Sequence, residues 1–302
     1  MIALTPACDW NHKSVPALAN IPVTFIGQSA SIELHGVEPN MKIVSLVALA
    51  IATFGAWLFR AGLPPTQASE GRVPVLVELF TSEGCSSCPP ADAFLQKLDH
   101  DQPISGADIV VLSEHVDYWD ELGWKDPYSS RLFTDRQAAY GQRFGLRTVY
   151  TPQMVVDGAS EFVGNDSRLA EKAFSKALSK AKIGIRFSSV SAETGFVRAH
   201  LETDSLPAEL GLREGEVYVA LALDHAETQV SRGENSGRKL TYTSVLRTLE
   251  RVGTLRAGDS FSKDIHLKLE RGADPRSLRL IAFVQEPGYG KVAGAAMRSI
   301  GK

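Results

Sequence analysis

The chain has 302 residues, of which 44% are hydrophobic and 22% charged, and its formal net charge is −3. This composition is typical of a globular protein with room for two domains and a sizeable core. The charge balance and the lack of a basic block exclude the usual signature of a nucleic-acid-binding protein, so we expect no nucleic-acid partner.

The N-terminal segment predicts export. Lys42 forms a short positive region before a largely apolar run over residues 43–59, and helix-breaking and small residues follow. We therefore expect Met41 to be the natural start, residues 1–40 to be an over-extended N-terminus, and residues 41–68 to be a signal peptide. An uncleaved anchor is the alternative, because the run reaches only the lower limit of a membrane span. Either case places the remaining chain in the periplasm or outside the cell, with membrane contact only through that anchor.

Strands and helices alternate over residues 70–182. The apolar run at 72–80 predicts a buried strand, and apolar residues at helical spacing predict a helix over 91–98. The further expected elements are a strand at 109–112, a helix at 129–144, two strands around the turn Asp157-Gly158, and a helix that ends near Lys182. This order, β-α-β, helical insertion, β-β-α, predicts an α/β protein with a thioredoxin-like fold that carries a helical insertion.

From Ile183 onwards the hydrophobic pattern changes to a period of two. Apolar residues alternate with other side chains in 197–201, 217–223 and 264–270, and residues 278–284 are mostly apolar. Several short alternating strands in succession predict an antiparallel sheet pair. We therefore expect a β-rich, sandwich-like domain over residues 183–302.

Two cysteines at a C-x-x-C spacing lie between the first strand and the first helix. Cys85 and Cys88 are separated by two serines and followed by two prolines. A helix N-terminus stabilises a thiolate there, and the short spacer lets the second sulfur reach the first. This context indicates a redox pair, in which Cys85, expected nearer the surface, attacks a substrate and Cys88 resolves the mixed disulfide.

Two other uses of the cysteines stay open. A structural disulfide across two residues would close almost no loop entropy and would stabilise little. A structural zinc site needs four ligands, and there is no second cysteine pair. The remaining cysteine, Cys8, precedes the expected cleavage site.

Pro152 and Glu78 are expected to support the dithiol. Pro152 begins the third strand, where a cis proline would face the dithiol and position the substrate chain, while an ordinary trans proline is the alternative. Glu78 shares a strand face with Leu76 and Phe80, so we expect partial burial. A buried carboxylate with a raised pKa could relay protons to Cys88, or Glu78 could pair with a nearby Lys or Arg.

Polar and aromatic residues follow the second strand. His115, with Asp117 nearby, could tune the thiolate, supply a third Cu(I) ligand beside Cys85 and Cys88, or satisfy a loop hydrogen bond. Three aromatic residues of this stretch either line a substrate groove or pack the insertion: Trp119, Trp124 and Tyr128. The turn-rich segment 232–238 is interpreted as a surface loop.

Several of these motifs together resemble a known family. The motif residues are those of 80–92, 115–119, 124–127 and 233–235. Over about residues 72–300 the chain resembles the bacterial secreted family catalogued as domain of unknown function 1223. The resemblance implies a thioredoxin-like fold, and it implies no substrate. Ser86-Ser87 departs from the Gly-Pro found between the cysteines of thioredoxin.

The sequence thus favours an exported thiol–disulfide oxidoreductase that acts on protein thiols or disulfides and needs no cofactor. The catalytic candidates are Cys85, Cys88, Pro152, Glu78 and His115. One alternative is a periplasmic copper-binding protein or chaperone, or a partner-binding protein whose dithiol is not catalytic. Another is that the second domain carries the function.

Overall fold

The computed structural model of the protein describes residues 71–193 and 195–301. The predictions for residues 1–70, namely the over-extended N-terminus, the signal peptide or anchor and the position of Cys8, lie outside the described residues. Over the described ranges, no helix is both long and apolar enough to cross a membrane.

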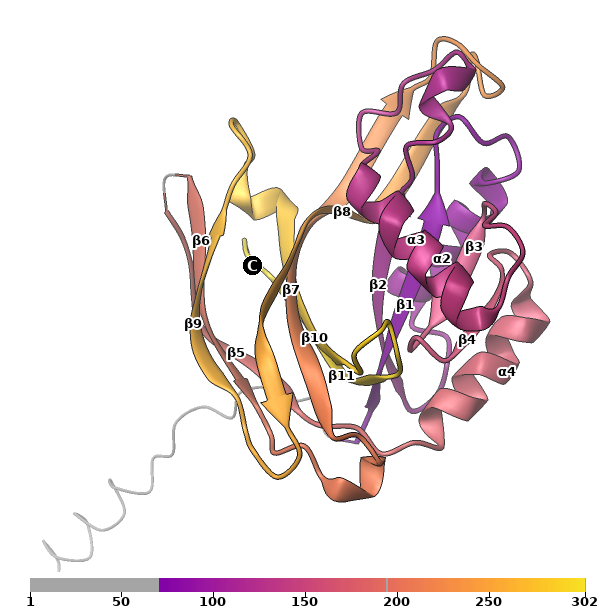
Figure 1. The fold of residues 1–302 in the computed structure, drawn as a ribbon. Coiled ribbons are helices and arrows are strands. Elements are labelled where there is room, and N and C mark those ends of the chain that lie inside the picture. Colours follow the sequence, from indigo (N-terminus) through magenta and orange to yellow (C-terminus); the bar gives the residue numbers. More distant parts are fainter. Residues whose placement is uncertain (1–70, 194, 302) are drawn as a thin grey trace, which may run out of the picture. The chain divides into compact units, whose positions relative to one another are not determined.

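A mixed sheet of eight strands forms the centre of the fold, in the order β11-β10-β7-β8-β2-β1-β3-β4 (Figure 1). β1 and β2 are parallel, whereas β3 and β4 run antiparallel to their neighbours. The strands are β1 (Val73–Thr81), β2 (Ala107–His115), β3 (Gln153–Val156), β4 (Ser160–Val163), β7 (Glu214–Gln229), β8 (Lys239–Arg256), β10 (Leu278–Gln285) and β11 (Val292–Ser299).

Three α-helices cover the half of this sheet that contains β1. They are α2 (Pro89–Asp101), α3 (Arg131–Phe144) and α4 (Ser167–Leu178). Side chains of α2 and α4 pack against the face of β1 that carries Val77 and Leu79. α3 packs against the opposite face, where Leu76 and Phe80 lie. The alternation of side chains along β1 therefore decides which helix each residue meets.

A second, antiparallel sheet has the order β5-β6-β9 and comprises β5 (Ile185–Glu193), β6 (Phe196–Thr203) and β9 (Ser262–Lys268). Its inward residues, among them Val197 and Leu201, share one core with Val219 and Leu280 of the large sheet. The predicted period of two is confirmed in these strands, because alternate side chains enter that core. Three short 3₁₀ turns complete the described elements: η1 (Asp120–Leu122), η2 (Ala208–Leu210) and η3 (Pro275–Ser277).

The large sheet continues across the boundary predicted near Lys182. β8 joins β2 through the parallel pair Ser113–Val245, and the Ser244 hydroxyl donates to the Val111 carbonyl at 2.6 Å. The mixed α/β architecture is thus built around one sheet to which both halves of the sequence contribute strands.

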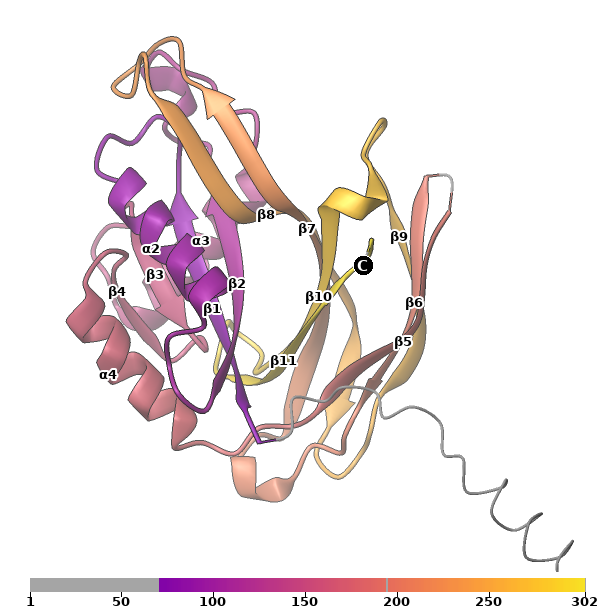
Figure 2. The same cartoon turned by 180° about the vertical axis from the view of Figure 1, so that it is seen from behind.

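The hairpin formed by β7 and β8 is long, with 16 and 18 residues in its strands. Both views show its outer end beside the helical half of the protein (Figures 1 and 2). The Gln96 side chain of α2 donates to the Thr241 carbonyl of β8 at 2.6 Å, and the Thr243 hydroxyl donates to Asp99 at 2.6 Å. These contacts hold the hairpin along α2, so that its end reaches the loop after β1.

Candidate functional site

The two cysteines form a disulfide at the start of α2, with their Cα atoms 5.4 Å apart. Cys88 is the N-cap residue of the helix, and Pro89 follows it. A proline suits this first position because its missing N–H has no helical partner there. The Cys88 carbonyl accepts from the Ala91 and Asp92 amides at 2.8 and 3.1 Å, which anchors the disulfide to the first turn.

Both cysteines are fully buried, with 0% exposed surface. The sequence predicts Cys85 nearer the surface, and this expectation is wrong. Ser86 and Ser87 are exposed and Cys85 is not. The physical reason is a cover that comes from the outer end of the β7–β8 hairpin, 150 residues further along the chain.

This cover is residues 230–238, called the tip segment below. The Asn235 amide donates to the carbonyls of Glu83 and Cys85, both at 2.9 Å, and its own side chain is fully buried. The Glu234 carboxylate accepts from the Ser86 amide at 3.2 Å. Interpreting residues 232–238 as a simple surface loop therefore missed a direct contact with the dithiol loop. The signal in the sequence was a polar Gly-Glu-Asn run between two long strands.

Trp124 also contacts the tip segment, at Gly233. Gly233 has a φ of +74°, and an added Cβ would come within 3.1 Å of the Trp124 Cβ. The Trp124 indole N–H donates to the Glu83 carboxylate at 2.7 Å. Of the two uses predicted for Trp124, packing of the insertion is the one the structure supports.

A buried histidine–aspartate pair lies behind this loop. His115 Nδ1 is 2.7 Å from Asp126 Oδ2, and both side chains are fully buried. Asp126 also accepts from the Glu83 and Tyr128 amides, each at 2.8 Å. Tyr242 packs edge-on against the imidazole, with ring centroids 4.6 Å apart. His115 therefore satisfies a loop hydrogen bond, which was one of its three predicted uses.

Several buried polar atoms around this pair have no hydrogen-bond partner among the described residues. They are Glu83 Oε1, Asp92 Oδ1, His115 Nε2 and the Tyr242 hydroxyl. Buried groups of this kind normally bind protein or ordered water, so the cluster marks a polar site rather than ordinary core.

Burial changes the acidity of this cluster. It raises the pKa of Asp92 to about 7, and the same effect, with the nearby Asp126 charge, raises the pKa of Glu83. Burial alone would lower the pKa of His115, but the Asp126 carboxylate outweighs it and the pKa is raised. Asp92 lies one helical turn after Cys88. A group that titrates near neutral pH therefore lies on the same helical turn as the disulfide.

Glu78 lies on the other face of β1. Its carboxylate accepts from Arg136 Nε at 2.7 Å and from the Tyr140 hydroxyl at 2.6 Å, and it is fully buried. Both partners belong to α3, whereas the disulfide belongs to α2. The structure thus places Glu78 in the ion pair that was its alternative use, and Asp92 and Glu83 are the carboxylates on the dithiol side.

Pro152 follows a cis peptide bond from Thr151, as predicted, and immediately precedes β3. Trp119 connects this position to the dithiol loop. Its indole N–H donates to the Thr151 hydroxyl at 2.9 Å, and its Cβ would lie 3.1 Å from a Cβ added at Gly84.

The predicted copper ligands do not form a recognisable metal site. Among residues 71–193 and 195–301, no three His, Cys, Asp or Glu side chains are arranged to hold a metal ion. The Asp117 carboxylate has a local partner, because it accepts a hydrogen bond from the Thr134 hydroxyl at 2.6 Å.

Comparison with solved structures finds similar folds. A protein from Agrobacterium tumefaciens shares 26% identity with a TM-score of 0.60, and the match covers 76% of this chain and 96% of that one. HBP35 of Porphyromonas gingivalis has 15% identity and a TM-score of 0.56, with 76% of each chain covered, and is similar in fold alone.

No curated protein matches the chain. The model of a protein family of unknown function, DUF1223, matches residues 76–285. This match includes the dithiol, the histidine–aspartate pair and the tip segment, and the chain therefore belongs to the DUF1223 family.

Proposed function

We propose that this protein is an exported thiol–disulfide oxidoreductase with a thioredoxin-like fold, acting on protein thiols or disulfides through Cys85 and Cys88. The observation that carries the proposal is the disulfide at the first turn of α2 beside a buried acid whose pKa is raised to about 7. A cross-link that served stability alone would gain almost nothing from closing a two-residue loop.

The arrangement of elements supports the thioredoxin-like part of the proposal. The strand order β2-β1-β3-β4, with α2 after β1 and α4 after β4, follows the predicted β-α-β and β-β-α units. The position of α3 between β2 and β3 supports the expected helical insertion. The sheet β5-β6-β9, packed on β7 and β10, supports the predicted sandwich-like region. This support is by analogy of fold, and the chemistry rests on the site.

The exchange proceeds in two balanced steps. A substrate thiolate attacks Cys85 Sγ, the Cys85–Cys88 bond breaks, and the Cys88 sulfur leaves with the electron pair and takes up a proton. A second substrate thiol then attacks the mixed disulfide, which releases Cys85 as a thiolate and the substrate as a disulfide. Two substrate thiols are oxidised and one protein disulfide is reduced, and the reverse order reduces a substrate.

Two features of the site assist these steps. The N-terminus of α2 stabilises negative charge on the sulfur that is released there. Asp92, on the same turn, is half protonated near neutral pH because burial raises its pKa to about 7. It can therefore give a proton to the Cys88 sulfur in one direction and accept it in the other.

A trapping experiment tests the proposal and the assignment of the two sulfurs. The reduced Cys88→Ser variant, incubated with a peptide that contains a disulfide, should accumulate a mixed disulfide at Cys85, because no resolving thiol remains. The matched Cys85→Ser variant should accumulate much less. Mass spectrometry of the digested protein locates the adduct. If neither variant forms an adduct faster than an unfolded cysteine peptide does, the proposal fails.

A further inference from the structure

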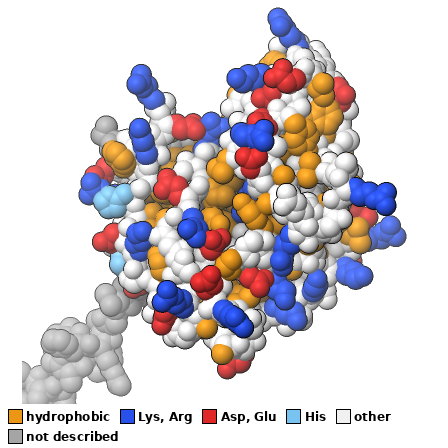
Figure 3. All heavy atoms as spheres, in the orientation of Figure 1, with side chains coloured by type: hydrophobic (Ala, Val, Ile, Leu, Met, Phe, Trp, Pro, Cys, Tyr) orange, Lys and Arg blue, Asp and Glu red, His pale blue; other side chains and the backbone are white. Residues whose placement is uncertain are grey.

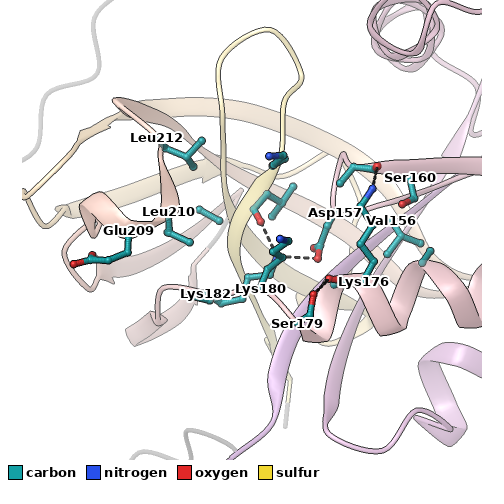
Figure 4. Close-up of a pocket in the computed structure, with 17 residues that line it drawn as sticks. Val156, Asp157, Ser160, Lys176, Ser179, Lys180, Lys182, Glu209, Leu210 and Leu212 are labelled. Atoms are coloured by element: carbon teal, nitrogen blue, oxygen red, sulfur yellow. Dashed lines mark hydrogen bonds and ion pairs between the residues drawn. The ribbon is translucent and has the colours of Figure 1, made fainter.

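A cavity of about 550 Å³ lies beside the C-terminal end of α4 and shares no lining residue with the dithiol site (Figure 4). Its walls come from α4 and the residues after it, the β3–β4 turn, η2 with Leu212 just after it, and the start of β11. This volume lies within the range of small-molecule binding sites in proteins, about 300–1,000 Å³.

The lining carries more positive than negative charge. Four lysines line the cavity, Lys176, Lys180, Lys182 and Lys291, against the two carboxylates of Asp157 and Glu209. Figure 3 shows Lys and Arg side chains gathered over α4 as well. An anionic ligand is therefore favoured over a cationic one.

Two of the four ammonium groups are already used. Lys182 pairs with Asp157 at 2.8 Å and donates to the Val292 carbonyl at 2.6 Å, as Figure 4 shows. Lys176 donates to the Ala159 carbonyl at 3.0 Å. The side chains of Lys180 and Lys291 have no partner among the residues that the structure describes, and both are exposed. They are the groups available to a ligand.

Apart from Ser160 and Ser179, the rest of the lining is apolar. Leu210 and Leu212 extend from the η2 side, and Val156 lies across the cavity from them (Figure 4). Val292, the first residue of β11, adds a further apolar side chain. Ala173 and Ala177 of α4 add two small side chains that leave room between these walls. Such a surface gains free energy by covering a hydrocarbon body, which an inorganic anion does not offer.

We propose that this cavity binds an amphiphilic anion, with a carboxylate or phosphate head at Lys180 and Lys291 and a hydrocarbon chain against Leu210 and Leu212. A free fatty acid and an anionic lipid headgroup share this chemistry. Charge-assisted hydrogen bonds to the two ammonium groups orient the head, and burial of the chain supplies most of the affinity.

Displacement of a fluorescent fatty acid from the full-length protein tests this proposal. Dodecanoate and dodecyl phosphate should compete saturably, and dodecyltrimethylammonium and inorganic phosphate should not. The double variant Lys180→Glu/Lys291→Glu should bind dodecanoate at least about tenfold more weakly, because it turns both head contacts repulsive. The matched control Lys97→Glu/Lys125→Glu makes the same charge change at exposed lysines outside the cavity and away from α4, and it should bind like the wild type.

Phosphatidylglycerol vesicles distinguish the two sources of the anion. If the wild type sediments with the vesicles and the double variant does not, the ligand is a lipid headgroup. If free dodecanoate competes but the protein does not bind the vesicles, the ligand is a free fatty acid. Either result supports the site. Three results overturn it: no saturable binding of either anionic amphiphile, equal competition by the cationic one, or unchanged affinity in the double variant.

Discussion

Replacing Asn235 with alanine removes the contacts by which the tip segment covers the disulfide. The Asn235 amide donates to the carbonyls of Glu83 and Cys85, both at 2.9 Å, and its oxygen accepts from Arg238 at 2.9 Å. Because both cysteines have 0% exposed surface, a reductant reaches them only when the tip segment moves away. Asn235→Ala should therefore accelerate reduction of the disulfide.

The size of this effect follows from the two lost hydrogen bonds. Each contributes about 0.5–1.5 kcal/mol net, and a buried carbonyl left without a donor costs about 1–3 kcal/mol. A loss of about 2–3 kcal/mol in the covered state shifts its opening equilibrium about 30- to 150-fold. If reduction occurs from the open state, its rate rises by the same factor.

The assay follows free thiols by alkylation during reduction with dithiothreitol, with urea unfolding of the oxidised protein measured in parallel. Ser236→Ala is the control, because the exposed Ser236 hydroxyl donates to the Ser231 carbonyl within the tip segment and has no other partner among the described residues. An Asn235→Ala rate within about twofold of the control would refute the reasoning, since the lost contacts predict at least a tenfold change. An acceleration that is fully explained by a lower global stability of the variant would also refute the reasoning.

Three further variants test other parts of the site. Asp92→Asn should remove a pH dependence of stability. Because the folded pKa of about 7 exceeds the unfolded value, wild-type stability falls by about 2–3 kcal/mol as the pH rises from 5 to 8, and urea unfolding at both pH values should show that the variant lacks this fall. Arg136→Ala leaves Glu78 buried without its cation and should cost about 3–5 kcal/mol in urea unfolding, with the redox midpoint unchanged; a shifted midpoint would show that this ion pair reaches the dithiol. His115→Ala should leave disulfide exchange largely intact, and loss of tight Cu(I) binding in this variant would instead favour the copper alternative.

The sequence best predicted the structural features that depend on short spacings between residues along the chain. The helices around Leu95, Tyr140 and Phe174 follow from the 3.6-residue period, and the dithiol at a helix start follows from the Cys-x-x-Cys-Pro-Pro run. Local patterns of this kind carry their own physical cause, because they set which side chains share a face.

The sequence could not supply contacts between distant segments. Asn235 meets the Glu83 carbonyl across 152 residues, and no local pattern of the tip segment encodes that partner. The burial of Glu78 followed from strand alternation, but its partner Arg136 depended on where α3 packs. The sequence analysis did not single out Asp92, because only its burial in the folded protein makes it a group that titrates near neutral pH.

The most direct test of the account is the redox equilibrium of the Cys85–Cys88 pair in graded glutathione buffers, with alkylated peptides identified by mass spectrometry so that Cys8 is counted separately. The account predicts a reversible transition with a midpoint above about −250 mV, as in exchangeable catalytic disulfides. A bond that stays closed below about −300 mV would identify a structural disulfide and contradict the proposed function.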